Sequence, residues 1–329
     1  MIAFSYVHML PMQEFVSMNF DDDFGVLLLA YRRSTSLNDI LVACSRAGIK
    51  RIYINIDGPK SSSHSDFSDR KRVLDFCKNW ENEHPEISIR MNIREENLGC
   101  SASVLQSIDW AFVFERHLIV LEDDCVPDVS FFNFCRDSLS ILTNENNVML
   151  SCGSQFAPLY LTKKKWMISK YALTWGWATT RTKWLRLKDY MQLEEKNRNS
   201  RISLYEQVYW RAGARRARYG FVDVWDTILV NAMIENGLTS ILPAMTLVSN
   251  KGDDAFATHT HDDSTWLHQQ IGFYSRSWTL QENHDVDDWL KRNFYKIRFR
   301  HLFSTIVSRV LDEIFSKRRK VSHLSVRWQ

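Results

Sequence analysis

The stretch from residue 25 to residue 151 alternates short apolar runs with longer amphipathic segments. Runs rich in Val, Ile and Leu predict buried strands, and apolar residues three or four positions apart predict helices. The predicted strands are 26–30, 52–56, 87–93, 117–121 and 148–151, and the predicted helices are 37–47, 69–83, 100–114 and 129–142. Strands separated by helices of this length indicate βαβ units, so we expect an α/β fold around a parallel sheet.

The second half of the chain has a less regular pattern. Residues 203–217 and 225–235 have helical spacing, 237–242 is typical of a turn followed by a strand, and 250–263 of a polar loop. Because no linker or internal repeat precedes residue 262, we expect one domain over 25–261. The segment 1–24 is then an extension, and 262–329 is a helical, basic tail.

Charge is concentrated near the carboxyl end. Residues 291–320 hold ten Lys or Arg and two acids, a local net charge of +8, so the rest of the chain carries −5 within the total of +3. A mildly acidic body argues against a general nucleic-acid binder. Apolar residues recur at helical spacing over 303–314, and the basic run 317–320 follows, as in helices that lie on anionic membranes. The alternative is a helix packed on the domain or on a second subunit, as in a homodimer.

Composition narrows the class of protein further. The chain has 329 residues, 45% of them hydrophobic and 25% charged, which is typical of a folded globular protein. Six scattered cysteines without a Cys-x-x-Cys pair suit a reducing compartment. The first twelve residues lack Lys and Arg, which disfavours a secretory signal. These features predict a cytoplasmic protein.

An acidic triplet is the sharpest chemical feature. The predicted strand 117–121 ends directly in Glu122, Asp123 and Asp124, and Pro127 follows the turn. Three adjacent carboxylates repel one another, so their place after a buried strand favours a bound cation. Oxygen ligands on a short segment suit Mg2+ or Mn2+, which often share coordination with substrate phosphates. A solvated acidic turn is the alternative.

With five other stretches, the triplet resembles the GT-A glycosyltransferases, in the branch of N-acetylglucosaminyltransferase I and bacterial family 2-type surface-polysaccharide transferases. The stretches are residues 29–35, 56–59, 94–100, 108–112, 121–127 and 174–179. This resemblance implies a Rossmann-like nucleotide-binding sheet flanked by helices. It also implies a nucleotide-sugar-binding half over 25–153 and an acceptor-binding half over 154–261.

The resemblance implies roles for residues at the strand ends. Asp124 would bind the divalent metal, Asp123 the donor ribose and Glu122 the transferred sugar. Asp57 would hold the uracil. The other residues implied at the donor site are Ala30, Tyr31, Arg33, Arg94, Asn97 and Gly99. The alternatives are a helix cap or surface ion pair for Arg33 and an ordinary turn for Asp57.

An inverting transferase needs a carboxylate that deprotonates the acceptor hydroxyl. Asp226 lies in a Trp-Asp segment before an amphipathic helix, where the resemblance places that base. Aspartate is also a favoured helix cap, which is the alternative. The reserve candidates are Asp223, Asp253 and Asp254.

Aromatic and histidine residues complete the expected site. Trp175 and Trp177 flank Gly176 in the stretch that resembles the acceptor loop; aromatic faces stack on sugar rings, and glycine permits close approach. Core packing is the alternative for both tryptophans. By resemblance, His259 is a candidate ligand of the metal or of phosphate, and His261 is a weaker one. A surface or capping role is the alternative for these histidines.

Together these features predict a metal-dependent inverting glycosyltransferase of the hexosyltransferase type, with Mn2+ or Mg2+ as cofactor. It would move a sugar from a UDP-linked donor to a lipid-linked glycan in O-antigen or capsule synthesis, at the inner face of the cytoplasmic membrane. A sugar nucleotidyltransferase is the runner-up, although residues 31–35 lack the glycine-rich loop of that class. A catalytically degenerate transferase that serves as a membrane assembly partner is the third alternative.

Overall fold

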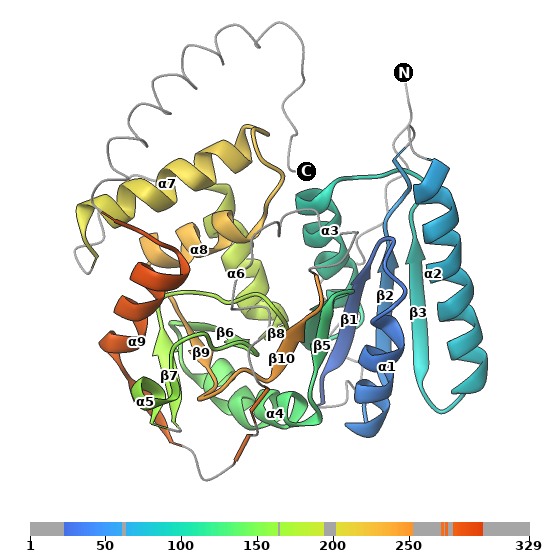
Figure 1. Ribbon diagram of the computed structural model, residues 1–329, viewed down its shortest axis with the longest axis horizontal. Helices are drawn as coiled ribbons and strands as arrows, with labels where there is room; N and C mark the ends of the chain where they lie inside the picture. The colour runs from blue at the N-terminus through green and yellow to red at the C-terminus, as the bar shows by residue number, and fades with distance from the viewer. Residues whose placement is uncertain are drawn as a thin grey trace, which may run out of the picture.

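The strands and helices predicted between residues 25 and 151 are all present in a computed structural model of the chain (Figure 1). The structure describes residues 23–60, 64–163, 165–193, 202–252, 271–272, 274–275 and 279–298. Helices lie on both faces of a large sheet, so the predicted α/β class is confirmed.

The strands of the large sheet are β1 (Gly25–Ala30), β2 (Arg51–Ile56), β3 (Ser88–Ile93), β4 (His117–Glu122), β6 (Val148–Cys152), β7 (Trp166–Ser169), β8 (Trp177–Thr180), β9 (Thr239–Leu242) and β11 (Leu280–Glu282). A second, two-stranded sheet pairs β5 (Cys125–Pro127) with β10 (Val248–Asn250). The helices are α1 (Leu37–Arg46), α2 (His64–Glu83), α3 (Cys100–Phe112), α4 (Val129–Asn144), α5 (Leu159–Thr162), α6 (Arg181–Gln192), α7 (Leu204–Arg218), α8 (Asp226–Glu235), α9 (His284–Trp289) and the π-helical turn η2 (Leu290–Phe294).

The large sheet is mixed, which differs from the expected parallel sheet. Its order is β11-β7-β9-β6-β8-β4-β1-β2-β3. β3, β2, β1 and β4 lie side by side and are parallel to one another, as expected of βαβ units. In contrast, β8 runs antiparallel to both β4 and β6, and β7 runs antiparallel to β9. The strands that reverse the direction have three or four residues, too short for the sequence pattern to show them.

The sheet separates two hydrophobic cores. Successive residues of β1 face opposite sides: Leu27 packs in the core that includes residues of α3, α6 and α8, and Leu28 in the core that includes residues of α1, α2 and α4. This burial on both faces explains why β1 and residues 118–121 of β4 are apolar rather than alternating. Polar side chains can therefore gather only where these strands end.

Part of the segment assigned to the tail belongs to the fold. β11 pairs with β7 at the edge of the sheet, and Val286 and Leu290 are fully buried. Lys291, one of the basic residues of the expected tail, is buried too, and its Nζ lies 3.0 Å from Glu206 Oε2. The expected boundary at residue 261 therefore does not mark the end of the folded unit, because the sheet edge and the core include later residues.

The rest of the predicted tail, including the helical pattern over 303–314 and the basic run 317–320, lies outside the described residues. Among the helices that the structure describes, none is both long enough and apolar enough to cross a membrane. All six cysteines are free thiols.

Candidate active site

The carboxyl ends of β1, β2 and β4 meet at one edge of the sheet, because the three strands are parallel neighbours. In their register Ala30 lies beside Ile56, and Leu29 beside Glu122. A cavity of about 550 Å³ opens at this edge. The predicted site residues that line it are Ala30, Tyr31, Arg33, Asp57, Asn97, Gly99, Glu122, Asp123, Asp124, Trp175 and Asp226.

Arg33 lies between two carboxylates of the acidic triplet. Its Nη1 donates to Asp123 Oδ1 at 3.0 Å and to Asp124 Oδ2 at 3.1 Å. The backbone N–H of Tyr31 donates to the second oxygen of Asp123 at 3.0 Å. Because the Arg33 side chain is only 7% exposed, this pair is an internal feature of the site and not the surface ion pair of the alternative interpretation.

Burial and mutual repulsion set the protonation of the triplet. Burial raises the pKa of Glu122, and the negative charges of Asp124, Asp123 and Asp226 raise it further, against the opposing effect of Arg33. Burial and the charge of Asp124 likewise raise the pKa of Asp123. One guanidinium does not balance these carboxylates, so a further cation at this place would be stabilised.

The donor atoms around Asp124 fit a hard divalent cation. A Cβ on Gly252 would lie 2.7 Å from both Asp124 Oδ2 and Asn250 Oδ1, so the glycine leaves space beside two oxygens of the kind that Mg2+ and Mn2+ prefer. No three His, Cys, Asp or Glu side chains form a complete metal site within the described ranges. A metal ion here would take further ligands from substrate phosphates. The predicted ligand His259 lies outside the described residues, as does His261.

Asp57 holds the loop between β3 and α3. Asn97 Nδ2 donates to Asp57 Oδ2 at 3.2 Å, and the backbone N–H of Leu98 donates to Oδ1 at 3.3 Å. Burial raises the pKa of Asp57 in spite of these hydrogen bonds. A Cβ on Gly58 would lie 2.1 Å from the carbonyl carbon of Glu96, so this position accepts only glycine without a shift of the backbone. Asp57 therefore lines the cavity and also fixes its wall.

Arg94 is not among the residues that line the cavity, but it contacts Asn55, which is. Arg94 Nε donates to Asn55 Oδ1 at 3.2 Å, and Asn92 Nδ2 donates to the same oxygen at 2.8 Å. Asn55 is 1% exposed, and it lines the cavity. The sequence analysis missed Asn55, although a single amide inside the apolar run of β2 was a signal for it.

The first turn of α3 borders the cavity and is capped from a distant loop. Asp223 accepts hydrogen bonds from the backbone N–H of Cys100 at 2.6 Å and of Ser101 at 2.9 Å. Gly99, with φ of 79°, leaves room for this carboxylate, since a Cβ there would lie 2.6 Å from Asp223 Oδ2. Asp223, a reserve candidate for the base, is thus a helix cap. The other two reserve candidates, Asp253 and Asp254, lie outside the described residues.

Asp226 lies in the first turn of α8 and lines the cavity, and its role as the base stays a prediction. It is the first residue of α8, and its Oδ1 accepts a hydrogen bond from the backbone N–H of Thr227 at 2.7 Å. Its side chain is also exposed and lines the cavity, where its charge contributes to the raised pKa of Glu122. This hydrogen bond to the first turn of α8 holds the carboxylate in a defined place at the cavity.

The two tryptophans on either side of Gly176 have different surroundings: one lines the cavity and the other is in the core. Trp175 lines the cavity. Trp177 is 1% exposed and packs against Trp184 with 6.1 Å between the ring centroids, so the predicted acceptor contact is wrong for this residue. Gly176, with φ of 69°, passes Val248 closely, because a Cβ there would lie 2.8 Å from Val248 Cγ2. Close packing thus accounts for the glycine.

A buried acid that the sequence analysis missed fixes the loop after β1. Asp66, which is 1% exposed, accepts hydrogen bonds from the Tyr31 hydroxyl at 2.5 Å and from Arg32 Nη1 at 2.6 Å. The backbone N–H of Lys60 donates to it at 3.2 Å. These bonds hold the loop that places Arg33 beside the triplet. No local pattern pointed to Asp66, since it lies 35 residues from Tyr31.

Comparison with known proteins finds no matching family model and no match among curated proteins. The chain is similar to the structure of residues 1–349 of TarS from S. aureus, with 9% identity and a TM-score of 0.43 over 70% of this chain and 61% of that chain. It is similar to the mannosyltransferase PcManGT from Pyrobaculum calidifontis in complex with GDP-Man and Mn2+, with 11% identity and a TM-score of 0.32 over 55% and 52% of the two chains. The third structure is a candidate glucose-1-phosphate thymidylyltransferase from Bacillus anthracis in complex with sucrose (11% identity, TM-score 0.31, 58% and 82%). The chain spans about three fifths of the first of these structures and about half of the second.

Proposed function

We propose that this chain is a metal-dependent glycosyltransferase that uses a nucleotide-sugar donor. The observation that carries the proposal is that a single cavity is lined both by the acidic triplet at the end of β4 and by Asp226. Arg33 contacts two carboxylates of that triplet. Open α/β sheets bind ligands outside the carboxyl ends of their strands, which is where this cavity lies. Its volume of about 550 Å³ is in the range of small-molecule sites.

The lining supports a nucleoside diphosphate as the donor carrier, with UDP as the expected form. Asp57 offers a carboxylate to the edge of a base, and Asn97 holds that carboxylate in place. Asp124 is the group that would hold the metal ion, with Arg33 beside it. Bound there, Mg2+ or Mn2+ would neutralise the diphosphate and stabilise the charge that develops on it as it leaves.

Asp226 is the proposed base. The oxygen of the acceptor hydroxyl bonds to the anomeric carbon while the bond from that carbon to the diphosphate oxygen breaks. The electron pair of the broken bond leaves with the nucleoside diphosphate, and the hydroxyl proton passes to Asp226. Attack on the face away from the leaving group inverts the anomeric configuration. The guanidinium of Arg33 stabilises the negative charge of the leaving group.

The proposed acceptor is a lipid-linked glycan of bacterial surface-polysaccharide synthesis, as the resemblance in the sequence implies. Trp175 at the cavity supports a sugar acceptor, because aromatic faces pack well against sugar rings. The basic run 317–320 supports a location at an anionic membrane surface.

Calorimetric titration of UDP tests the donor site. We expect binding in the presence of Mn2+, no binding with EDTA, and no binding to the Asp124→Ala variant. Glu86→Ala is the matched control, because this acid is exposed and lies in the turn before β3, away from the cavity. If UDP fails to bind with Mn2+ present, the uridine assignment is wrong, and GDP, dTDP and CMP are titrated next. Failure of all four would favour the degenerate assembly partner.

Product analysis separates the two enzyme classes. A glycosyltransferase incubated with its UDP-sugar releases UDP, by slow hydrolysis when no acceptor is present. A sugar nucleotidyltransferase incubated with UTP and a sugar phosphate releases pyrophosphate instead. Release of pyrophosphate without any release of UDP from UDP-sugars would overturn the proposal in favour of the runner-up.

A further inference from the structure

A second cavity, of about 520 Å³, lies beside the cavity at the ends of β1, β2 and β4, which we call the nucleotide cavity. Thr174, Trp175 and Asp226 line both cavities. The residue that we assign as the base is therefore at the junction of two spaces. A base in that position can take a proton from a molecule in one cavity while a donor occupies the other.

The walls of the second cavity are aromatic. Phe156 lies between Trp175 and Phe294, with ring centroids 4.9 Å and 4.4 Å away. Tyr295 follows Phe294 in the chain, and its ring centroid is 4.8 Å from that of Trp210 in α7. Ring faces of this kind suit the apolar faces of a sugar.

The second cavity also has a cationic residue in its lining. Arg216, in the last turn of α7, is among the residues that line this space. A guanidinium is suited to bidentate hydrogen bonds with phosphate or carboxylate. Aromatic faces, a cation and the proposed base thus meet around one space.

We propose that the second cavity binds the acceptor and that this acceptor is a saccharide carrying an anionic group, which lies beside Arg216. The inference rests on the proposed function, since it assigns a substrate class to the other side of Asp226. The saccharide ring lies against the aromatic walls, and its reacting hydroxyl reaches Asp226 at the junction with the nucleotide cavity.

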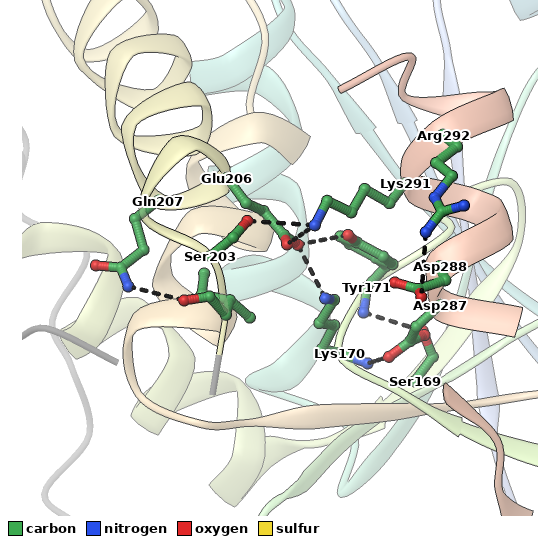
Figure 2. Close-up of polar contacts among 11 residues, drawn as sticks. Ser169, Lys170, Tyr171, Ser203, Glu206, Gln207, Asp287, Asp288, Lys291 and Arg292 are labelled. Atoms are coloured by element: carbon green, nitrogen blue, oxygen red, sulfur yellow. Dashed lines mark hydrogen bonds and ion pairs between the residues drawn. The ribbon is translucent and has the colours of Figure 1, made fainter. Parts of the chain in front are cut away.

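The wall that Phe294 and Tyr295 form is held by a buried ionic cluster (Figure 2). Glu206 of α7 is fully buried; its Oε2 lies 3.0 Å from Lys291 Nζ, and its Oε1 lies 3.0 Å from Lys170 Nζ. The Tyr171 hydroxyl donates to Glu206 at 2.5 Å. Although burial opposes ionisation, these partners hold the pKa of Glu206 below its usual value.

Lys291 lies in η2, whose last residue is Phe294, so its ion pair fixes the segment that supplies the aromatic wall. Glu206 is therefore a positioning residue for the acceptor cavity. We expect Glu206→Gln to raise the KM for acceptor while the affinity for UDP stays as in the wild type. If the variant binds acceptor and UDP more weakly by the same factor, Glu206 has a general structural role instead.

A pair of probes with one hexose ring and different charge tests the proposal: glucose 1-phosphate and methyl α-glucoside. Binding is measured by saturation-transfer NMR on the full chain with UDP and Mg2+ present, so that the nucleotide cavity is filled. We expect glucose 1-phosphate to bind about tenfold more tightly than the neutral glycoside. Arg216→Gln should weaken glucose 1-phosphate about tenfold, because a charge-assisted hydrogen bond is lost, and should leave the neutral probe unchanged.

Two further variants make the result specific. Arg215→Gln is the matched control, because its guanidinium lies 5.5 Å from the ring centroid of Tyr219, and we expect wild-type affinity for both probes. Phe294→Leu removes a ring face and should weaken both probes. Equal affinity of the two probes, or glucose 1-phosphate binding that is unchanged in Arg216→Gln, would overturn the anionic acceptor. Binding of neither probe at tens of millimolar would overturn the saccharide site.

The failure of this inference is distinguishable from failure of the proposed function. Asp124→Ala should lose UDP binding and keep Arg216-dependent binding of glucose 1-phosphate. If the wild type binds no nucleotide but still binds glucose 1-phosphate through Arg216, the proposed function fails and the acceptor role with it, whereas the sugar-phosphate site stands. If UDP binds and neither probe does, only the acceptor inference fails.

Discussion

Two aspartates three residues apart, Asp223 and Asp226, have different surroundings and therefore different proposed roles. Both carboxylate oxygens of Asp223 accept hydrogen bonds from backbone N–H groups in the first turn of α3. Asp226 accepts a hydrogen bond from the backbone N–H of Thr227 with one oxygen and lines both cavities. Nothing in their local sequence separates them as candidates for the base, because each precedes or begins the same helix.

The Asp226→Asn variant tests this assignment. We expect kcat for sugar transfer to fall by about 10²- to 10⁴-fold, because the amide cannot accept the acceptor proton, while the Kd for UDP with Mn2+ is unchanged. Asp223→Asn is the matched comparison. It should mainly lower the free energy of unfolding by about 1 kcal/mol through the weakened cap. Loss of transfer in Asp223→Asn with activity kept in Asp226→Asn would reverse the assignment.

At the scale of secondary structure elements, loops rather than strands give the nucleotide cavity its shape. The loop after β2 and the loop before α3 pack closely at Gly58, and Asp57 joins them by hydrogen bonds to Asn97 and Leu98. This contact joins two consecutive βαβ units at the point where a base would bind. A side chain larger than glycine at position 58 would therefore disturb the wall of the nucleotide cavity.

We expect Gly58→Ala to lower the free energy of unfolding by about 1–3 kcal/mol, since the added methyl group would overlap the backbone at Glu96. UDP affinity should fall as Asp57 moves, and calorimetry with thermal unfolding measures both effects. Gly48→Ala is the control. Its φ of 76° makes alanine strained, but no atom lies within 4 Å of the added Cβ, so UDP affinity should not change. Wild-type UDP affinity in Gly58→Ala would show that this wall is not needed.

Helix α9, which directly precedes the η2 segment of the acceptor wall, has a titratable group of its own. Asp287 of α9 accepts a hydrogen bond from the Ser169 hydroxyl at 2.6 Å and one from the backbone N–H of Lys170 at 3.3 Å. Burial raises its pKa to about 6, against the effect of these bonds. The carboxyl therefore binds a proton in the folded chain at pH values where the unfolded chain has released it.

This shift predicts a pH-dependent stability. The contribution of the Asp287 carboxyl is complete below the unfolded pKa of 3.8 and is lost as the pH rises through about 6. We expect Asp287→Asn, which cannot ionise, to gain Tm relative to the wild type between pH 4 and pH 7, as measured by calorimetry at each pH. Asp288→Asn is the control, because Asp288 is 57% exposed. A Tm difference that is constant across this range would contradict the prediction.

At the scale of the whole molecule, the two cavities of the proposed site are built from segments at opposite ends of the described chain. The nucleotide cavity is built mainly from loops after β1, β2 and β4, whereas the acceptor cavity needs α7, α8, the end of η2 and Tyr295. Residues 279–298 belong to the folded unit in consequence.

Membrane attachment is testable by sedimentation with vesicles. We expect the full chain to bind phosphatidylglycerol vesicles, and a variant with glutamine at positions 317–320 to bind at least 100-fold more weakly, since each cation near the surface contributes about 1 kcal/mol. Phosphatidylcholine vesicles are the control, because they carry no net charge. Equal sedimentation of both proteins, with dimers in light scattering, would instead favour the alternative in which the tail packs on a second subunit.

Local patterns of the chain suffice to predict the longer helices and strands of the first half and the place of the acidic triplet, but not the short elements β5 and α5. Periodicity shows which segments bury both faces, and three carboxylates after an apolar strand are visible without any partner. The same patterns could not show the direction of β8, the burial of Trp177, or the pairing of Asp66 with Tyr31. These depend on residues that are distant in the chain and gain their interaction energy only when the fold brings them together. For that reason the acceptor cavity, which joins Trp175, Asp226 and Phe294, was decided by tertiary structure alone.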